Sequence, residues 1–141
     1  MKKIIFLLFF LNQASANLKA DTIDFCQVYL NGVEIYQNNQ NSFGQVFVLK
    51  SKELKSTDIL TINYFRDTPC HDCACFMQIR TADSITILTS EGKGTFDPIS
   101  FKVKELLEYC RRTNTKIVDV FRDENNPYFK EGQLLFRIKL E

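Results

Sequence analysis

Residues 23–36 of this 141-residue chain read IDFCQVYLNGVEIY, and they decide the kind of fold that we expect. Two apolar-rich runs, 23–30 and 33–36, lie on either side of the pair Asn31-Gly32. An Asn-Gly pair between two such runs is the strongest short signal for a β-hairpin, because both residues tolerate the positive φ of a type I′ turn. The stretch therefore predicts two antiparallel strands joined by a two-residue turn.

Further strand-like runs follow the hairpin, separated by polar turns. Runs rich in β-branched and aromatic residues, or alternating between apolar and polar residues, are typical of strands with a buried face. We expect strands at residues 45–50, 59–66, 74–80, 85–89, 99–101, 116–122 and 133–140. The segment 90–95 contains Gly92 and Gly94, and we expect it to be a loop.

One late segment has the periodicity of a helix. Val103, Leu106, Leu107 and Cys110 are spaced as the apolar stripe of a helix, which predicts a helix over about residues 102–113. Because runs this short leave no room for parallel crossovers, we predict a mainly β fold, a two-layer antiparallel β-sandwich of about eight or nine short strands. The helix should close one end of the sandwich or cover a strand edge.

The first sixteen residues resemble a secretory signal peptide. Lys2 and Lys3 precede an unbroken apolar run, 4–11, and the small residues Ala14 and Ala16 form a cleavage site. An apolar run of that length spans about 12 Å as a helix, far less than the roughly 30 Å core of a membrane. We therefore expect residues 17–141 to form one secreted or periplasmic domain without a membrane anchor after cleavage.

The charge balance excludes one class of partner. The chain has 18 basic and 17 acidic residues, and loss of Lys2 and Lys3 changes its formal charge from +1 to −1. Binding to nucleic acid needs a concentrated basic surface that releases counterions, and this composition implies none. We therefore expect no nucleic-acid partner.

Two of the five cysteines are expected to lie in the core. Cys26 shares a strand face with Val28 and Leu30, and Cys110 lies on the apolar stripe of the helix. A buried cysteine packs as a small hydrophobic residue, and an exported protein also permits a disulfide between Cys26 and Cys110. An odd number of cysteines leaves at least one thiol without an internal partner.

The other three cysteines surround the only histidine, in the order Cys70, His71, Cys73 and Cys75. One interpretation is structural: Cys70 and Cys73 close a small loop as a disulfide while Cys75 packs inward. A second is a zinc or copper site with Cys70, His71, Cys73 and Cys75 as ligands, although such sites are usually built from two separated pairs. A third is a C-x-x-C redox pair, which here lacks the helix that normally follows such a pair.

No catalytic set can be assembled from the sequence, because its only histidine lies in the cysteine loop. The fragment 28–35 resembles the hairpin of many extracellular sandwich domains, including jelly rolls that bind sugars. Exposed aromatic residues are the usual platform for sugars, and the candidates are Tyr29, Tyr36, Tyr64 and Tyr128. We therefore predict a non-catalytic binding or interaction module for a protein or carbohydrate ligand, with a thiol-dependent metal or redox protein as the alternative.

Overall fold

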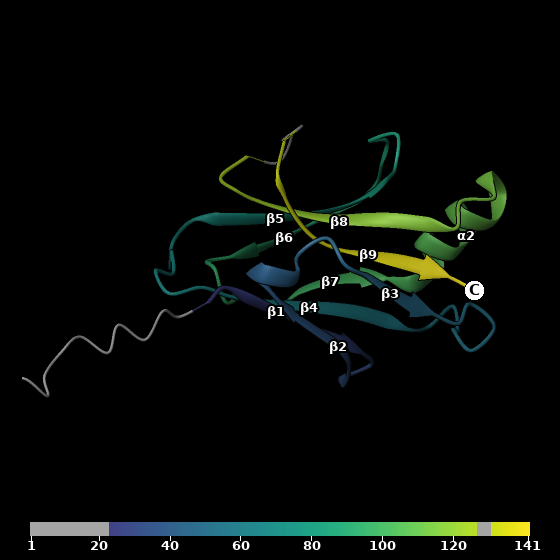
Figure 1. The fold of residues 1–141 in the computed structure, drawn as a ribbon, viewed down its shortest axis with the longest axis horizontal. Coiled ribbons are helices and arrows are strands. Elements are labelled where there is room, and N and C mark those ends of the chain that lie inside the picture. Colours follow the sequence, from purple (N-terminus) through teal and green to yellow (C-terminus); the bar gives the residue numbers. More distant parts are fainter. Residues whose placement is uncertain (1–22, 127–130) are drawn as a thin grey trace, which may run out of the picture.

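The computed structural model describes residues 23–126 and 131–141, which form two facing β-sheets and one α-helix (Figure 1). The predicted signal peptide, 1–16, lies outside the described residues. The predicted mainly β sandwich with one late helix is confirmed. Its elements are β1 (Phe25–Leu30), β2 (Val33–Asn39), the 3-10 turn η1 (Gln40–Ser42), β3 (Val46–Leu49), β4 (Ile59–Phe65), β5 (Ala74–Thr81), β6 (Thr86–Lys93), β7 (Ile99–Lys102), α2 (Val103–Thr113), β8 (Ile117–Glu124) and β9 (Gln133–Leu140).

The predicted hairpin is formed by β1 and β2. Asn31 and Gly32 both have positive φ, 51° and 81°, as a type I′ turn requires. The Asn31 side chain also ties the turn to the start of β4, because its amide nitrogen donates to Asp58 and its oxygen accepts from the Ile59 N–H, each at 2.9 Å. The turn residue thus sets the position of the neighbouring strand as well as the hairpin.

The strands are arranged in the orders β2-β1-β4-β7 and β3-β9-β8-β5-β6. The prediction of antiparallel pairing throughout is wrong at one position, because β3 pairs with β9 in parallel, with Val46 opposite Arg137 and Leu49 opposite Leu140. No hairpin joins β3 to its partner β9. The chain leaves the first sheet at β2 and enters the second at its edge, so this crossing between layers sets the direction of β3.

The core lies between the inner faces of the two sheets. Val28, Leu60 and Ile62 of the first sheet and Val120 and Phe136 of the second are at most 1% exposed. An aromatic cluster fills the side of the core next to β3, where the Tyr36 and Phe47 rings stack at 4.4 Å and both meet Phe136 edge-on. These contacts join β2, β3 and β9 across the two layers.

Helix α2 connects β7 of the first sheet to β8 of the second, and it lies at the end of the sandwich where β9 ends (Figure 1). Val103, Leu106 and Cys110 face the core, as the apolar stripe predicts. Asn114 ends the helix in the left-handed conformation, with its N–H bonded to the Cys110 carbonyl. Among the described residues, no helix has the length and apolar character to cross a membrane.

The expected loop at 90–95 is instead mostly strand, because β6 continues through Gly92 to Lys93. Gly92 pairs with Cys75 of β5, and a Cβ atom on it would lie 3.0 Å from Asp97 Oδ2 and 3.1 Å from Ile99 Cγ1. Gly92 therefore occupies a strand position where neighbouring atoms leave no room for a side chain. Composition alone does not distinguish such a glycine from a glycine in a turn.

Candidate functional site

The cysteine loop that connects β4 to β5 is attached to the turn after β6. The Cys70 N–H donates to Thr95 Oγ1 at 2.8 Å, and the Thr95 N–H donates to the Cys70 carbonyl at 2.7 Å. The Gly94 N–H donates to the Cys73 carbonyl, also at 2.7 Å. These three hydrogen bonds hold both ends of the Cys70–Cys73 segment in place.

Gly94 is the residue that lets the two segments meet. Its φ is +78°, and a Cβ atom here would lie 2.8 Å from the His71 carbonyl oxygen and 3.0 Å from that of Cys70. Only glycine satisfies both the backbone angle and the contact without displacing the loop.

The three clustered cysteines form a row from the surface into the core. Cys70 is half-buried, whereas Cys73 and Cys75 are 7% and 1% exposed. The Cys73 N–H donates to Cys70 Sγ at 3.0 Å, and Cys73 Sγ lies 3.8 Å from Cys75 Sγ. Burial and the adjacent sulfurs raise the pKa of Cys73 to about 12. The inward orientation predicted for Cys75 agrees with its position next to Met77 and Ile79 on the buried face.

All five cysteines are free thiols in the structure, so neither expected bridge, Cys70–Cys73 or Cys26–Cys110, is formed in it. Cys26 and Cys110 are both buried, as their patterns predict. Cys26 Sγ donates to Asn38 Oδ1 at 2.6 Å, and burial raises its pKa to about 12. The pKa of Cys110 rises to about 11 through burial, partly offset by Lys116. The two bridges stay predictions for an oxidising compartment.

A buried arginine lies beside the innermost thiol. Arg122 points inward from β8, is 5% exposed, and donates from Nη2 to Cys75 Sγ at 3.4 Å and to Glu124 Oε1 at 2.7 Å. Its guanidinium carbon lies 4.0 Å from the centroid of the Tyr64 ring on the opposite sheet. The same Glu124 oxygen accepts from Arg66 at 3.0 Å. Arg122 therefore joins the two sheets, the carboxylate and the thiol.

The metal set expected from the sequence is only partly brought together. Among the described residues, the metal-capable atoms that gather within 4.8 Å belong to Cys73, Cys75 and Glu124. Neither Cys70 nor the exposed His71 belongs to this group. Glu124 is partly buried, which raises its pKa, but Arg122 and Arg66 lower it overall. Because two guanidinium groups already bond the only carboxylate of this group, Glu124 is poorly placed to bind an added zinc or copper ion.

Within the described part of the chain, the candidate tyrosines do not gather on one exposed surface. The Tyr36 ring packs on Phe47, and Tyr64 is 2% exposed with its hydroxyl donating to Asp24 at 2.5 Å. Tyr29 lies on the outer face of the first sheet, and Tyr128 lies outside the described residues. The aromatic residues that do gather at the surface are phenylalanines.

These phenylalanines line an open hollow of about 530 Å³ at the end of the sandwich that holds the cysteine loop. We call it the aromatic hollow, and its lining residues are Ile23, Phe25, Phe65, Arg66, Asp67 and Phe96. Phe25 and Phe65 are cross-strand partners whose rings stack at 4.5 Å, and Phe96 lies 5.8 Å from Phe65. Phe96 is 44% exposed, so its ring is available to a ligand.

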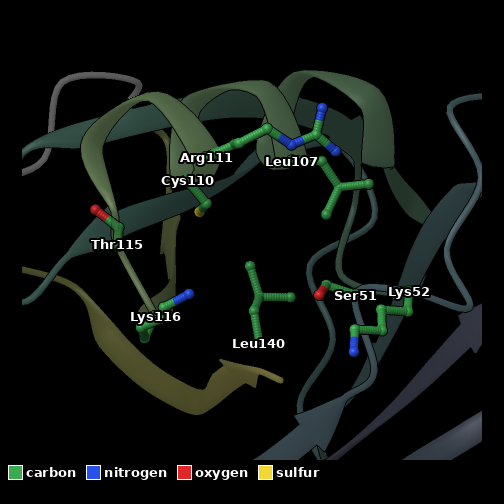
Figure 2. Close-up of a pocket in the computed structure, with 8 residues that line it drawn as sticks. All are labelled: Ser51, Lys52, Leu107, Cys110, Arg111, Thr115, Lys116 and Leu140. Atoms are coloured by element: carbon green, nitrogen blue, oxygen red, sulfur yellow. The ribbon is translucent and has the colours of Figure 1, made fainter.

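A second cavity, of about 320 Å³, lies between α2 and the end of β9. We call it the basic pocket, and its lining residues are Ser51, Lys52, Leu107, Cys110, Arg111, Thr115, Lys116 and Leu140. Figure 2 shows the Cys110 sulfur and the Lys116 ammonium nitrogen pointing into it, with Leu140 on the opposite wall. Three lining residues are basic and none is acidic. The pocket is suited to a small anion with an apolar part.

Sequence reasoning missed Arg122 and Phe96. Val118, Val120, Arg122 and Glu124 share the inward face of β8, so strict alternation indicates an inward arginine, the one available signal. Phe96 follows Gly94 in a turn and carries no such pattern. No protein-family model, curated protein or solved structure matches this chain.

Proposed function

We propose that this protein is a small exported binding module, without catalytic activity, that holds a carbohydrate in the aromatic hollow. One observation carries the proposal: three phenylalanine rings line a single hollow on the surface of the sandwich, and Phe96 remains 44% exposed there. Aromatic rings that stay exposed in a concave site commonly serve a ligand, because they bury a large apolar area at little entropic cost. The export part of the proposal is supported by residues 1–16, which resemble a signal peptide.

The charges around the hollow favour a neutral ligand rich in hydroxyl groups. Arg66 and the exposed Asp67 supply one cation and one anion, so the lining has no net charge. Two residues further along the same strand face, the amide side chains of Gln27 and Asn63 face each other across β1 and β4. Sugar hydroxyls both donate and accept hydrogen bonds, which matches carboxylate, guanidinium and amide partners together.

Binding to soluble neutral polysaccharides tests this proposal, with retardation in native affinity gels followed by calorimetry on the best ligand. We expect Phe96→Ala to raise the Kd about tenfold, which corresponds to ~1.4 kcal/mol, because it removes one wall of the hollow. Ile85→Ala is the matched control, since Ile85 is 54% exposed in the turn at the other end of β6. Absence of binding to every neutral polysaccharide, or equal affinity of the Phe96 variant and the parent, contradicts the proposal. Retention of apolar peptides instead assigns the hollow to a protein partner.

A second ligand class is favoured by the basic pocket. Among the described residues, no ion pair involves Lys52, Arg111 or Lys116. A short-chain carboxylate would place its charge near Lys116 and its chain against Leu107 and Leu140. Calorimetry with hexanoate should show binding that Lys116→Gln abolishes. Lys104→Gln, which removes a lysine paired with Glu108 on the same helix, should leave it unchanged.

A further inference from the structure

The three clustered thiols differ in exposure in the way that a thiol–disulfide exchange site requires. Exchange begins when a thiolate attacks an external disulfide, so the first thiol must be reachable from solvent. Cys70 is half-buried in an otherwise rigidly held loop, whereas Cys73 is 7% exposed and Cys75 is 1% exposed. An external disulfide can therefore reach Cys70 first.

Hydrogen bonds also hold the sulfurs at both ends of the row in place. Cys70 Sγ accepts the Cys73 backbone N–H at 3.0 Å, which holds the Cys70 sulfur against the residue that carries the second thiol. Cys75 Sγ accepts from Arg122 Nη2 at 3.4 Å, which fixes the position of the innermost sulfur. The middle thiol, Cys73, lies between them, at 3.8 Å from Cys75 Sγ. Cys73 thus lies next to both of the other cysteines.

We propose that Cys70, Cys73 and Cys75 form a thiol–disulfide exchange site that accepts oxidising equivalents from an external disulfide of the glutathione type. The Cys70 thiolate attacks the external disulfide, forms a mixed disulfide and releases one thiolate. Cys73 then attacks the Cys70 sulfur, forms the Cys70–Cys73 disulfide and releases the second thiolate. The protons of Cys70 and Cys73 end on the two released thiols, so two protein thiols are oxidised and one external disulfide is reduced.

Cys75 distinguishes this site from a permanent structural bridge. Its thiolate can attack the Cys73 sulfur, which transfers the disulfide to Cys73–Cys75 and restores the Cys70 thiol. A bridge with a third sulfur 3.8 Å from one of its atoms is therefore open to internal exchange, which moves the disulfide to the two more buried sulfurs. Arg122 acts here as a positioning residue, because it binds Cys75 and does not contact the external disulfide.

The experiment exposes the reduced purified protein to glutathione disulfide, alkylates the remaining thiols after acid quenching, and maps the disulfides by mass spectrometry. We expect two isomers, Cys70–Cys73 and Cys73–Cys75, and return of both to thiols when reduced glutathione is added. Cys73→Ser should trap Cys70 as a mixed disulfide with glutathione. Cys75→Ser should leave only the Cys70–Cys73 bridge and speed its reduction by glutathione about tenfold, because the bridge can no longer move to the two buried sulfurs.

Cys110→Ser is the control, because that buried cysteine lies at the helix, away from the cysteine loop, and its replacement should change neither isomer. Arg122→Lys keeps a positive charge and should lower the share of the Cys73–Cys75 isomer without affecting attack at Cys70. Circular dichroism verifies that each variant is folded. A bridge that resists reduced glutathione, a Cys73 variant without mixed disulfide at Cys70, or equal reduction rates with and without Cys75 would each overturn the proposal.

Discussion

Gly94→Ala and Gly32→Ala form a matched pair of substitutions that tests how the cysteine loop is held. Both glycines have nearly the same left-handed backbone, with φ of +78° and +81°. Around Gly32 there is no other atom within 4 Å of an added Cβ, whereas at Gly94 the Cβ meets the His71 and Cys70 carbonyl oxygens at 2.8 and 3.0 Å. The two substitutions therefore share the backbone penalty and differ in the clash.

The expected losses of stability follow from these contacts. A left-handed conformation costs an alanine about 1–2 kcal/mol relative to glycine, so we expect Gly32→Ala to lower the free energy of unfolding by about 1 kcal/mol. At Gly94 the contacting atoms are backbone carbonyls, which cannot rotate away as a side chain can. Relief of the clash must separate the loop from the Gly94–Thr95 turn and weaken its three hydrogen bonds, each contributing about 1 kcal/mol. We expect a total loss of about 3–4 kcal/mol.

Urea unfolding of the two variants and the parent, under reducing conditions, measures both values. An unchanged slope of free energy against urea concentration would verify that the comparison concerns the folded state. Equal losses for the two variants would refute the reasoning, because they would mean that the cysteine loop is not in contact with Gly94. Faster alkylation of Cys73 in the Gly94 variant alone would support it, since loosening the loop exposes this thiol.

Further predictions concern the buried thiols and the buried arginine. The pKa values of Cys26 and Cys110 are raised from 9.0 to about 12 and about 11, so above pH 9 the unfolded chain loses protons that the folded protein keeps. The contribution of these two thiols to stability should therefore be constant below pH 9 and fall above it by up to about 1.4 kcal/mol per pH unit for each thiol. Cys26→Ala should reduce this slope in unfolding experiments between pH 8 and 11. Arg122→Ala should cost about 3 kcal/mol in urea unfolding, because it removes the contact with Tyr64 and leaves Glu124 with Arg66 alone. Arg112→Ala, at an exposed position on α2, should cost less than about 0.5 kcal/mol, and a similar loss at both positions would contradict a structural role for Arg122.

Local signals predicted most of the fold because each depends on neighbours in the chain. The Asn31-Gly32 turn follows from the backbone freedom of those two residues, and the helix follows from the spacing of Val103, Leu106 and Cys110. The parallel pairing of β3 with β9 had no such signal, because it joins residues about ninety positions apart. The strand position of Gly92 also had no distinctive signal, because a glycine in a turn and a glycine packed against Asp97 and Ile99 look alike in sequence.

The candidate sites likewise have some features that the sequence shows and others that only the tertiary structure brings together. The grouping of Cys70, Cys73 and Cys75 is visible in the sequence, and so is the inward orientation of Cys75. Their partners Arg122 and Glu124 come from β8, which the antiparallel register with β5 places beside Cys75. The phenylalanines of the aromatic hollow come from β1, β4 and the turn before β7, so only the assembled first sheet brings them together.

The sequence by itself determined that this chain forms a β-sandwich with a late helix, and that three thiols are crowded next to one histidine. Those features depend on residues within one turn, one strand or one helix, where covalent geometry keeps the participants close. The tertiary structure decided which charges meet the thiols, that His71 lies outside the group that Glu124 completes, and where the aromatic rings gather. These depend on strand order and register between distant segments, which the packing of the two sheets sets and no local pattern encodes.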